Sequence, residues 1–181
     1  MLDQKTESSI GARVRKLIET MWEEWNSLNE RIAEFDSEFA AHARNDDAAR
    51  LLTTIPGIGA MNATALAAAV GDARTFSRGR DLAAWLGLVP RQVTTGGKPR
   101  LVGITKRGNK SLRKLLVHGA RSAMRSLAAS QTPLGGWLRG LLARMHKNTA
   151  TVALASQLAR IAWAVLRTRQ PFNASAAVAE A

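Results

Sequence analysis

The sequence predicts a mainly α-helical protein with a long N-terminal helical arm and a helical domain that includes one short β-hairpin or extended loop. Two observations predict this fold class. Apolar residues recur at helical spacing through most of the chain, and the helical period disappears only between residues 88 and 108. We therefore expect three regions, namely a coiled-coil arm over residues 1–47, a domain with a helix-hairpin-helix over residues 48–170 and a disordered tail over residues 171–181.

The composition excludes several classes of protein. A chain of 181 residues that is 46% hydrophobic can bury a core, so it is not wholly disordered. It has no cysteine, which excludes disulfides and thiolate metal sites. The N-terminus has no apolar segment after its charges, and we find no later run of about 18 apolar residues that would span a bilayer. We expect a cytoplasmic protein that does not enter a membrane.

The arm is predicted from an uninterrupted heptad pattern. No Pro or Gly occurs between Ala12 and Leu51, and charged residues fill the faces beside the apolar seam. Spacings of four and three over about four heptads are typical of a coiled coil or an antiparallel helical arm, so we expect self-association. The alternative is an ordinary amphipathic helix that lies on its own domain. The apolar seam consists of Val14, Ile18, Met21, Trp25, Leu28, Ile32, Phe35 and Phe39.

A turn with the sequence LLTTIPGIG, residues 51–59, leads into an alanine-rich helix. Its glycines free the backbone to bring unpaired amides close to a phosphate, as in a helix-hairpin-helix. The expected phosphate contacts are the amides around Gly57 and Gly59, the positive end of the next helix and the side chain of Asn62. A Pro-Gly turn that merely joins two helices is the alternative.

Further elements follow this turn. Ser77 is expected to cap a short helix that runs through Trp85 and ends at Gly87, a residue type that favours a left-handed helix terminus. Residues 93–102 resemble two β segments around a Gly-Gly turn. Three more helices are expected to begin at Asn109, after Gly135-Gly136 and at Asn148 or Thr149. The core-facing residues of the helix that begins at Asn109 are expected to be Leu112, Leu116, Ala120, Ala123 and Leu127. Those of the helix that begins at Asn148 or Thr149 are expected to be Leu154, Leu158, Ile161 and Val165.

The positive charge is confined to the second part of the chain. Residues 1–50 hold seven Lys and Arg against eleven acids, whereas residues 51–181 hold nineteen against three. Between residues 74 and 125 there are thirteen cations and one acid, Asp81. A field of this kind attracts polyanions, so the charge and the turn both favour a nucleic-acid backbone as the partner.

The segment WLGLVPRQVTTGGKPRLVGITKRGNKSLRKLLVHGAR, residues 85–121, is more specific. Together with LLTTIPGIG and the downstream ARIAWAVLR, it resembles the second domain of the two-domain insertion-sequence transposases that include the Piv-type DNA invertases. Members of this family that move with a structured RNA are known as bridge-RNA-guided recombinases. The resemblance covers the chain from the heptad arm onward and implies DNA as a partner, with a structured guide RNA as a second partner.

The resemblance also implies what accompanies such a domain. Family members have a RuvC-like domain whose four acids hold magnesium, then a helical linker, then this domain with a serine nucleophile. No acidic quartet precedes Leu51 here, so we expect no metal or cofactor in this chain, and magnesium only in the RuvC-like domain. At the place of the serine the chain has Thr94 and Thr95; Thr95 adjoins the glycines and is preferred, with Ser111 and Thr105 as weaker candidates. The alternative is two β-branched residues of a hairpin strand.

Basic residues flank this segment where glycines let a backbone approach closely. We expect them to bind phosphates and to stabilise charge during strand transfer, and a merely solvated basic face is the alternative. The set is Arg91, Lys98, Arg100, Lys106, Arg107, Lys110, Arg113, Lys114 and Arg121. Neither His42 nor His146 has partners at metal-ligand spacing, and we assign no catalytic role to His118.

The sequence therefore leads to one main functional hypothesis and two alternatives. The main one is the DNA-binding, strand-transfer part of a transposase or recombinase, which acts beside an acidic RuvC-like domain. The first alternative is a non-catalytic DNA-binding oligomer that is an accessory or regulator of a mobile element. The second is a basic helical protein that binds RNA.

Overall fold

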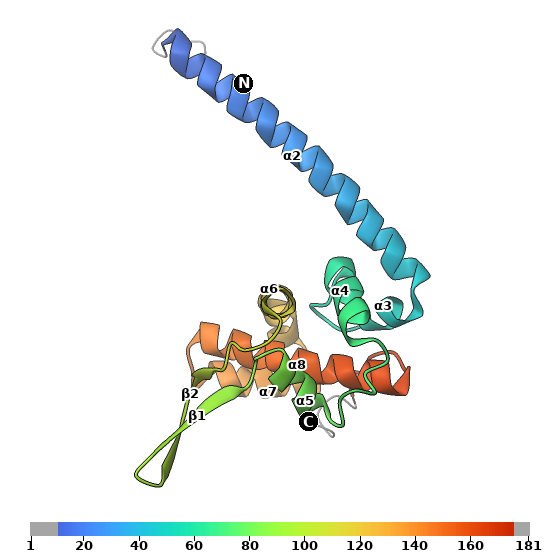
Figure 1. Ribbon diagram of the computed structural model, residues 1–181, viewed down its shortest axis with the longest axis vertical. Helices are drawn as coiled ribbons and strands as arrows, with labels where there is room; N and C mark the ends of the chain where they lie inside the picture. The colour runs from blue at the N-terminus through green and yellow to red at the C-terminus, as the bar shows by residue number, and fades with distance from the viewer. Residues whose placement is uncertain (1–10, 176–181) are drawn as a thin grey trace. The chain divides into compact units, whose positions relative to one another are not determined.

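The protein is mainly helical, with one small antiparallel sheet, as the sequence predicts. The computed structural model describes residues 11–175, which contain seven helices and two strands (Figure 1). The elements are α2 (Ala12–Asn45), α3 (Asp47–Leu52), α4 (Ala60–Val70), α5 (Gly79–Trp85), β1 (Pro90–Thr95), β2 (Lys98–Ile104), α6 (Lys110–Ala129), α7 (Pro133–Leu142) and α8 (Lys147–Thr168).

The chain divides into two compact units, one up to Phe39 and one from Ala40 onward. Helix α2 is a single continuous helix, and its residues up to Phe39 belong to the first unit, which confirms the predicted long helix. Residues 1–10 of the predicted arm lie outside the described part. The apolar seam of α2 is exposed to solvent from Val14 to Phe35, with Met21 69% and Trp25 60% accessible, and Phe39 is half-buried. Whether the arm forms a coiled coil stays a prediction.

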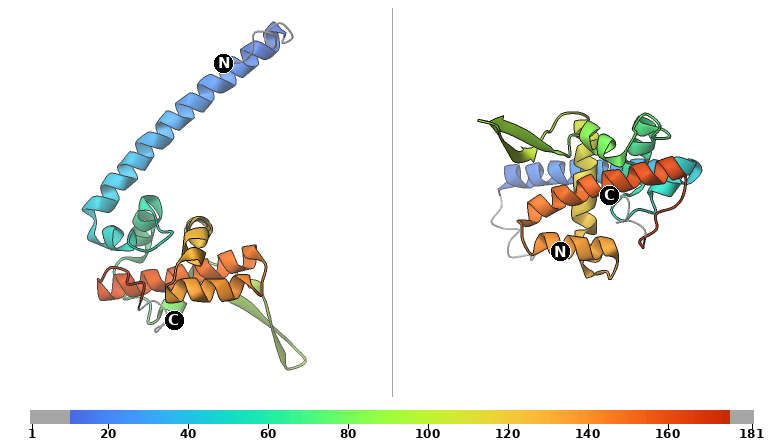
Figure 2. Two further views of the ribbon diagram at one scale, coloured as in Figure 1. Left: turned by 180° about the vertical axis from the view of Figure 1, so that it is seen from behind. Right: turned by 90° about the horizontal axis from the view of Figure 1, so that it is seen from below.

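The second unit is built around α8, which contacts α3, α5, α6 and α7. Figure 2 shows α6 crossing α8 in this unit. The predicted core positions of α8 are confirmed, because Leu154, Leu158, Ile161 and Val165 are all buried. The predicted inward face of α6 is likewise buried, and the two faces meet in one hydrophobic core.

The apolar character of α8 corrects one expectation. Lys147–Thr168 is long and apolar enough to cross a membrane by length and composition, with a mean hydropathy of 1.3, although no such run was expected. Within the fold 61% of this window is buried among the other helices. Its apolar side chains are therefore explained by their place in the core of the second unit.

Three helix starts differ from the predicted ones. The N-cap of α5 is Arg78 rather than Ser77, because the Asp81 carboxylate accepts the Arg78 N–H at 3.0 Å. Helix α8 is capped by His146, whose Nδ1 accepts the N–H of Asn148 at 3.2 Å. Helix α7 begins at Pro133 and includes the glycines that were expected to precede it, since proline suits the first position of a helix.

The segment after α8 stays in contact with the second unit as far as it is described. Phe172 packs against the core, and its N–H donates to Thr54 Oγ1 at 2.9 Å. Residues 176–181 of the predicted tail lie outside the described part of the chain. The C-terminal segment is thus tied to the turn between α3 and α4.

Candidate nucleic-acid interface

The β-hairpin is the most exposed part of the second unit. Gly96 and Gly97 have φ of +57° and +76°, which a tight two-residue turn requires and glycine allows. Figure 1 shows the hairpin extending away from the helices of its unit, and every residue from Pro90 to Gly103 is exposed. The strands pair Arg91 with Val102, Gln92 with Leu101, Val93 with Arg100, Thr94 with Pro99 and Thr95 with Lys98.

This register places the hairpin cations on one face. Residues that are directly opposite share a face of a sheet, and successive residues of a strand alternate between faces. Arg91, Arg100 and Lys98 therefore lie on the same face, together with Thr95. We call these four residues the cationic hairpin face. The other face carries Gln92, Thr94, Pro99 and Leu101.

The two candidate nucleophiles thus have different surroundings. Thr95 is directly opposite Lys98 on the cationic hairpin face. Thr94 is opposite Pro99 on the other face, and its Oγ1 accepts a hydrogen bond from Gln92 Nε2 at 3.3 Å. A phosphate bound by the cations would lie on the side of Thr95. The nucleophile itself stays a prediction.

Backbone contacts fix the root of the hairpin. Gly87, with φ of +71°, ends α5 as predicted, and a Cβ there would collide with the carbonyl oxygen of Arg107. A Cβ on Gly108 would likewise collide with the carbonyl oxygen of Trp85. The N–H of Lys106 donates to the Gly87 carbonyl at 3.2 Å. The close approach holds the exposed side chains of Lys106 and Arg107 next to the start of α6.

The guanidinium of Arg113 also contacts the root of the hairpin. Its Nη1 donates to the carbonyl oxygens of Leu86 at 3.0 Å and Arg107 at 3.3 Å, so it joins α6 to the end of α5. The sequence predicted Arg113 only as a phosphate-binding residue. The structural role was not predictable, because the two acceptors become neighbours only when the chain folds.

The other predicted cations of α6 form a stripe on its solvent side. Lys110, Lys114 and Arg121 are exposed, and their spacing of four and seven residues keeps them on one helix face. The buried residues of α6 occupy the opposite face. Asn109 caps this helix through a 3.0 Å bond from the Leu112 N–H, and no acid lies in its first turn. We call the three cations the α6 stripe.

No carboxylate among the described residues neutralises these cations. In the second unit, as far as residue 175, the ion pairs are Arg50 with Asp47 at 2.6 Å and Arg74 with Asp72 at 2.9 Å. None of the predicted phosphate-binding Lys and Arg residues takes part in either pair. Their charge is thus available to an anionic partner.

The turn between α3 and α4 lies against α6. Gly57 has φ of +87°, and a Cβ on it would be 2.6 Å from the carbonyl oxygen of Gly119. Gly59 is the N-cap of α4 and has no side-chain cap, and a Cβ there would meet nothing within 4 Å. A side chain at Gly59 would therefore meet no neighbour, whereas Gly57 serves the packing of the turn on α6.

Asn62 differs from the expected solvent-facing side chain. It is 6% exposed, and its Nδ2 donates to the Leu115 carbonyl on α6 at 3.3 Å. Its Oδ1 is buried with no hydrogen-bond partner among the described residues. The side chain therefore holds α4 against α6 and is not presented to a phosphate. The sequence suggested the opposite because Asn62 is the first polar side chain after the turn.

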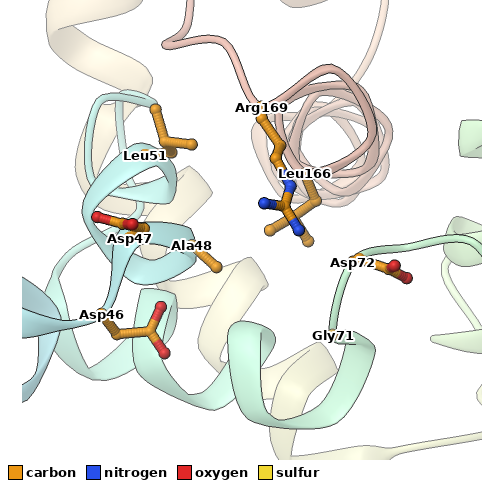
Figure 3. Close-up of a pocket in the computed structure, with 8 residues that line it drawn as sticks. All are labelled: Asp46, Asp47, Ala48, Leu51, Gly71, Asp72, Leu166 and Arg169. Carbon is orange, nitrogen blue, oxygen red and sulfur yellow. The ribbon is translucent and has the colours of Figure 1, made fainter.

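A separate cavity lies between α3, the end of α4 and the end of α8. Its volume is about 390 Å³, and Figure 3 shows Arg169 pointing into it. Asp46, Asp47 and Asp72 also line it, which disfavours a phosphate group. None of the predicted phosphate-binding residues lines this cavity. The candidate interface is thus the cationic hairpin face, the α6 stripe and the turn before α4.

Comparisons with known proteins agree on one family. Residues 49–133 match the family described as Transposase IS116/IS110/IS902. A probable family 20 transposase of Pseudomonas aeruginosa is 46% identical over 155 residues, which are 86% of this chain and 46% of that protein. The transposase for insertion sequence element IS1328 of Yersinia enterocolitica is 45% identical over 83% of this chain and 45% of its own length.

A more distant relative is named for gene inversion and not for transposition. The pilin gene-inverting protein of Moraxella bovis is 30% identical over 69% of this chain and 38% of its own length. The chain spans about half the length of the curated relatives that it matches first.

Proposed function

Because residues 49–133 match the family described as Transposase IS116/IS110/IS902, we propose that this chain is the DNA-binding, strand-transfer part of an insertion-sequence transposase or recombinase. The observation that carries the proposal is the cationic hairpin face, three unpaired cations around Thr95 on a hairpin that projects into solvent. The relatives are a probable family 20 transposase, a transposase for an insertion sequence element and a pilin gene-inverting protein, which supports action on DNA.

In this proposal the interface binds DNA mainly through phosphates. The hairpin face and the α6 stripe supply cations, which give affinity without sequence selectivity. The turn before α4 acts as a helix-hairpin-helix, in which the amides beside Gly59 and the positive end of α4 approach a further phosphate. Arg113 contributes by fixing the hairpin root to α6.

The strand-transfer step uses a threonine hydroxyl. Thr95 Oγ1 attacks a phosphodiester, a protein–phosphate ester forms, and one deoxyribose oxygen leaves with the proton. Attack by a deoxyribose hydroxyl on this ester reverses the exchange and joins the strands. Lys98, directly opposite Thr95, stabilises the charge on the phosphate oxygens during both steps.

Magnesium belongs to a separate acidic domain in this proposal. Residues 11–175 hold no group of three or more His, Asp or Glu side chains that could bind a metal ion, so no metal step is assigned to them. A RuvC-like domain with four acids would supply that chemistry, and a structured guide RNA is a further partner of the complete enzyme. The site of action is the cytoplasm, at the nucleoid.

The arm contributes self-association. Its heptad seam is exposed along α2, and an apolar surface of this kind is covered in a stable protein. Two copies joined through their arms would place two DNA-binding units in one particle. This arrangement suits a reaction that joins two DNA sites.

A salt titration tests DNA binding. The purified chain is expected to bind a short duplex with an affinity that falls steeply as salt rises, and the triple variant Arg91→Ala, Lys98→Ala, Arg100→Ala should lower the salt slope by up to about 2.7, at about 0.9 per lost phosphate contact. A matched control removes three exposed cations outside the interface, Arg144→Ala, Lys147→Ala and Arg167→Ala. Equal losses in both triple variants, or no binding at low salt, would contradict the proposal.

A second candidate function is a DNA-binding oligomer without catalysis, and it is favoured by threonine at the place of the expected serine. Recombination by a mixture of this chain with a full-length relative separates the two. Loss of activity in Thr95→Ala but not in Thr94→Ala supports a nucleophile on the cationic hairpin face. Unchanged activity in both favours the accessory role, and a preference for RNA in competition with DNA favours an RNA-binding protein.

A further inference from the structure

The exposed seam of α2 has a defined heptad register. The a positions are Ile18, Trp25 and Ile32, and the d positions are Val14, Met21, Leu28 and Phe35. These side chains are between 49% and 69% exposed. The seam is therefore uncovered along most of α2. A second helix that packs on it would form layers of facing a and d side chains.

The sizes of the seam residues favour one orientation of a second copy. In a parallel pair each residue meets itself, so Trp25 would face Trp25 while Val14 would face Val14. In an antiparallel pair a positions meet d positions, and Trp25 faces Leu28, Ile18 faces Phe35, and Ile32 faces Met21. No antiparallel layer holds two aromatic side chains, whereas Trp25 and Phe35 would each face their own copy in a parallel pair, so the antiparallel layers keep the distance between the helices more even.

From this we propose that α2 pairs with α2 of a second copy in antiparallel orientation, with Trp25 opposite Leu28. The inference rests on the self-association part of the proposed function and adds its geometry. The pairing is twofold symmetric, so each layer occurs twice. The two chains then leave the paired arms at opposite ends.

The charges beside the seam fit the same register. In an antiparallel pair, g positions of the two helices are neighbours, and Glu24 of one copy then meets Arg31 of the other. Symmetry gives two such opposite-charge pairs. In a parallel pair Glu24 would meet the uncharged Asn29, and the opposite-charge pairs would be Arg31 with Asp36, so the partner of Glu24 differs between the two orientations.

In the antiparallel pair, two exposed apolar residues outside the a and d positions also contact the second copy. Leu17 is 58% and Trp22 64% exposed on opposite flanks of the seam. The antiparallel register puts Leu17 beside Phe35 of the second copy and Trp22 beside Ile32 of the second copy. The seam is thus widened at its N-terminal half by residues that extend the same contact.

Disulfide trapping tests the orientation in the full chain. The natural sequence has no cysteine, so only introduced thiols can react. Copies with Ile18→Cys are mixed with differently tagged copies with Phe35→Cys, allowed to exchange and oxidised. We expect a mixed disulfide between the two variants, with at least ~10-fold less disulfide in either variant alone, because only opposed positions bring their Cα atoms within about 7 Å.

Charge reversal provides a second, independent measurement. Glu24→Arg should raise the dimer Kd by about tenfold, since two attractive pairs become repulsive. Adding Arg31→Glu to the same chain restores both pairs and the Kd in the antiparallel arrangement. In a parallel arrangement the added change would instead place a second carboxylate against Asp36 and weaken the dimer further.

The outcomes separate this inference from the function on which it rests. Strong disulfides within Ile18→Cys alone and within Phe35→Cys alone would overturn the antiparallel orientation and leave self-association standing. A chain that stays monomeric at high micromolar concentration would overturn both. DNA binding by the unaltered chain is measured separately, so its absence would count against the proposed function alone.

Discussion

Replacing Gly119 with alanine tests the contact that seats the turn before α4 on α6. An alanine Cβ at this position would collide with the carbonyl oxygen of Gly57 and lie 3.1 Å from its carbonyl carbon and 3.2 Å from Asn62 Nδ2. The first two atoms belong to the backbone, which cannot turn aside. The methyl group therefore forces α6 away from the turn.

The expected cost follows from three contributions. Overpacking a close contact costs about 1–3 kcal/mol, and separation of the helices also breaks the bond from Asn62 to the Leu115 carbonyl, worth about 0.5–1.5 kcal/mol. The better helix propensity of alanine returns about 1 kcal/mol. The free energy of unfolding should thus fall by about 0.5–3.5 kcal/mol, and Tm by about 1–14 °C.

Gly140→Ala is the matched control. Gly140 also lies within a helix, α7, but a Cβ there would meet nothing within 4 Å. Only the propensity gain remains, so this variant should be more stable by about 1 kcal/mol. Thermal and urea unfolding of both variants measure the difference. An increase in stability for Gly119→Ala equal to that of Gly140→Ala would refute the packing argument.

Three further variants test contacts that hold the second unit together. Trp163→Phe removes the 2.9 Å bond from the indole Nε1 to the Phe76 carbonyl, so urea unfolding should show a loss of about 1 kcal/mol. Arg113→Ala should increase hydrogen exchange at the hairpin root, where its guanidinium holds two carbonyl groups, and unchanged exchange would argue against that role. Leu154→Ala empties a fully buried position of α8 and should cost about 2–5 kcal/mol in thermal unfolding, far more than either of the others.

Much of the local structure was predictable because it is encoded by local patterns. The heptads over α2 and the inward face of α6 follow from helical periodicity, and the hairpin follows from two adjacent glycines between β-branched segments. Once the turn is known to be Gly96-Gly97, the strand register is fixed as well. That register is what brings Thr95 and three cations to one face.

Helix starts were predicted less well, because several polar residues in a row can act as caps. Arg78 takes this position in α5 only because Asp81 stands three residues later and accepts its N–H. His146 caps α8, although Asn148 and Thr149, whose residue types are common N-caps, follow it in the sequence. The choice depends on where packing ends the helix, and a local pattern does not contain that information.

The sequence by itself determined the family resemblance, the order of the helices, the hairpin and the excess of cations between residues 74 and 125. Only the tertiary structure decided that Asn62 is buried, that Gly57 meets Gly119 and that Arg113 binds two carbonyl groups. It also decided that α8, which is long and apolar enough to cross a membrane, is a core helix. The physical reason is separation along the chain, since partners more than 25 residues apart, such as Arg113 and Leu86, meet only through the packing of whole helices.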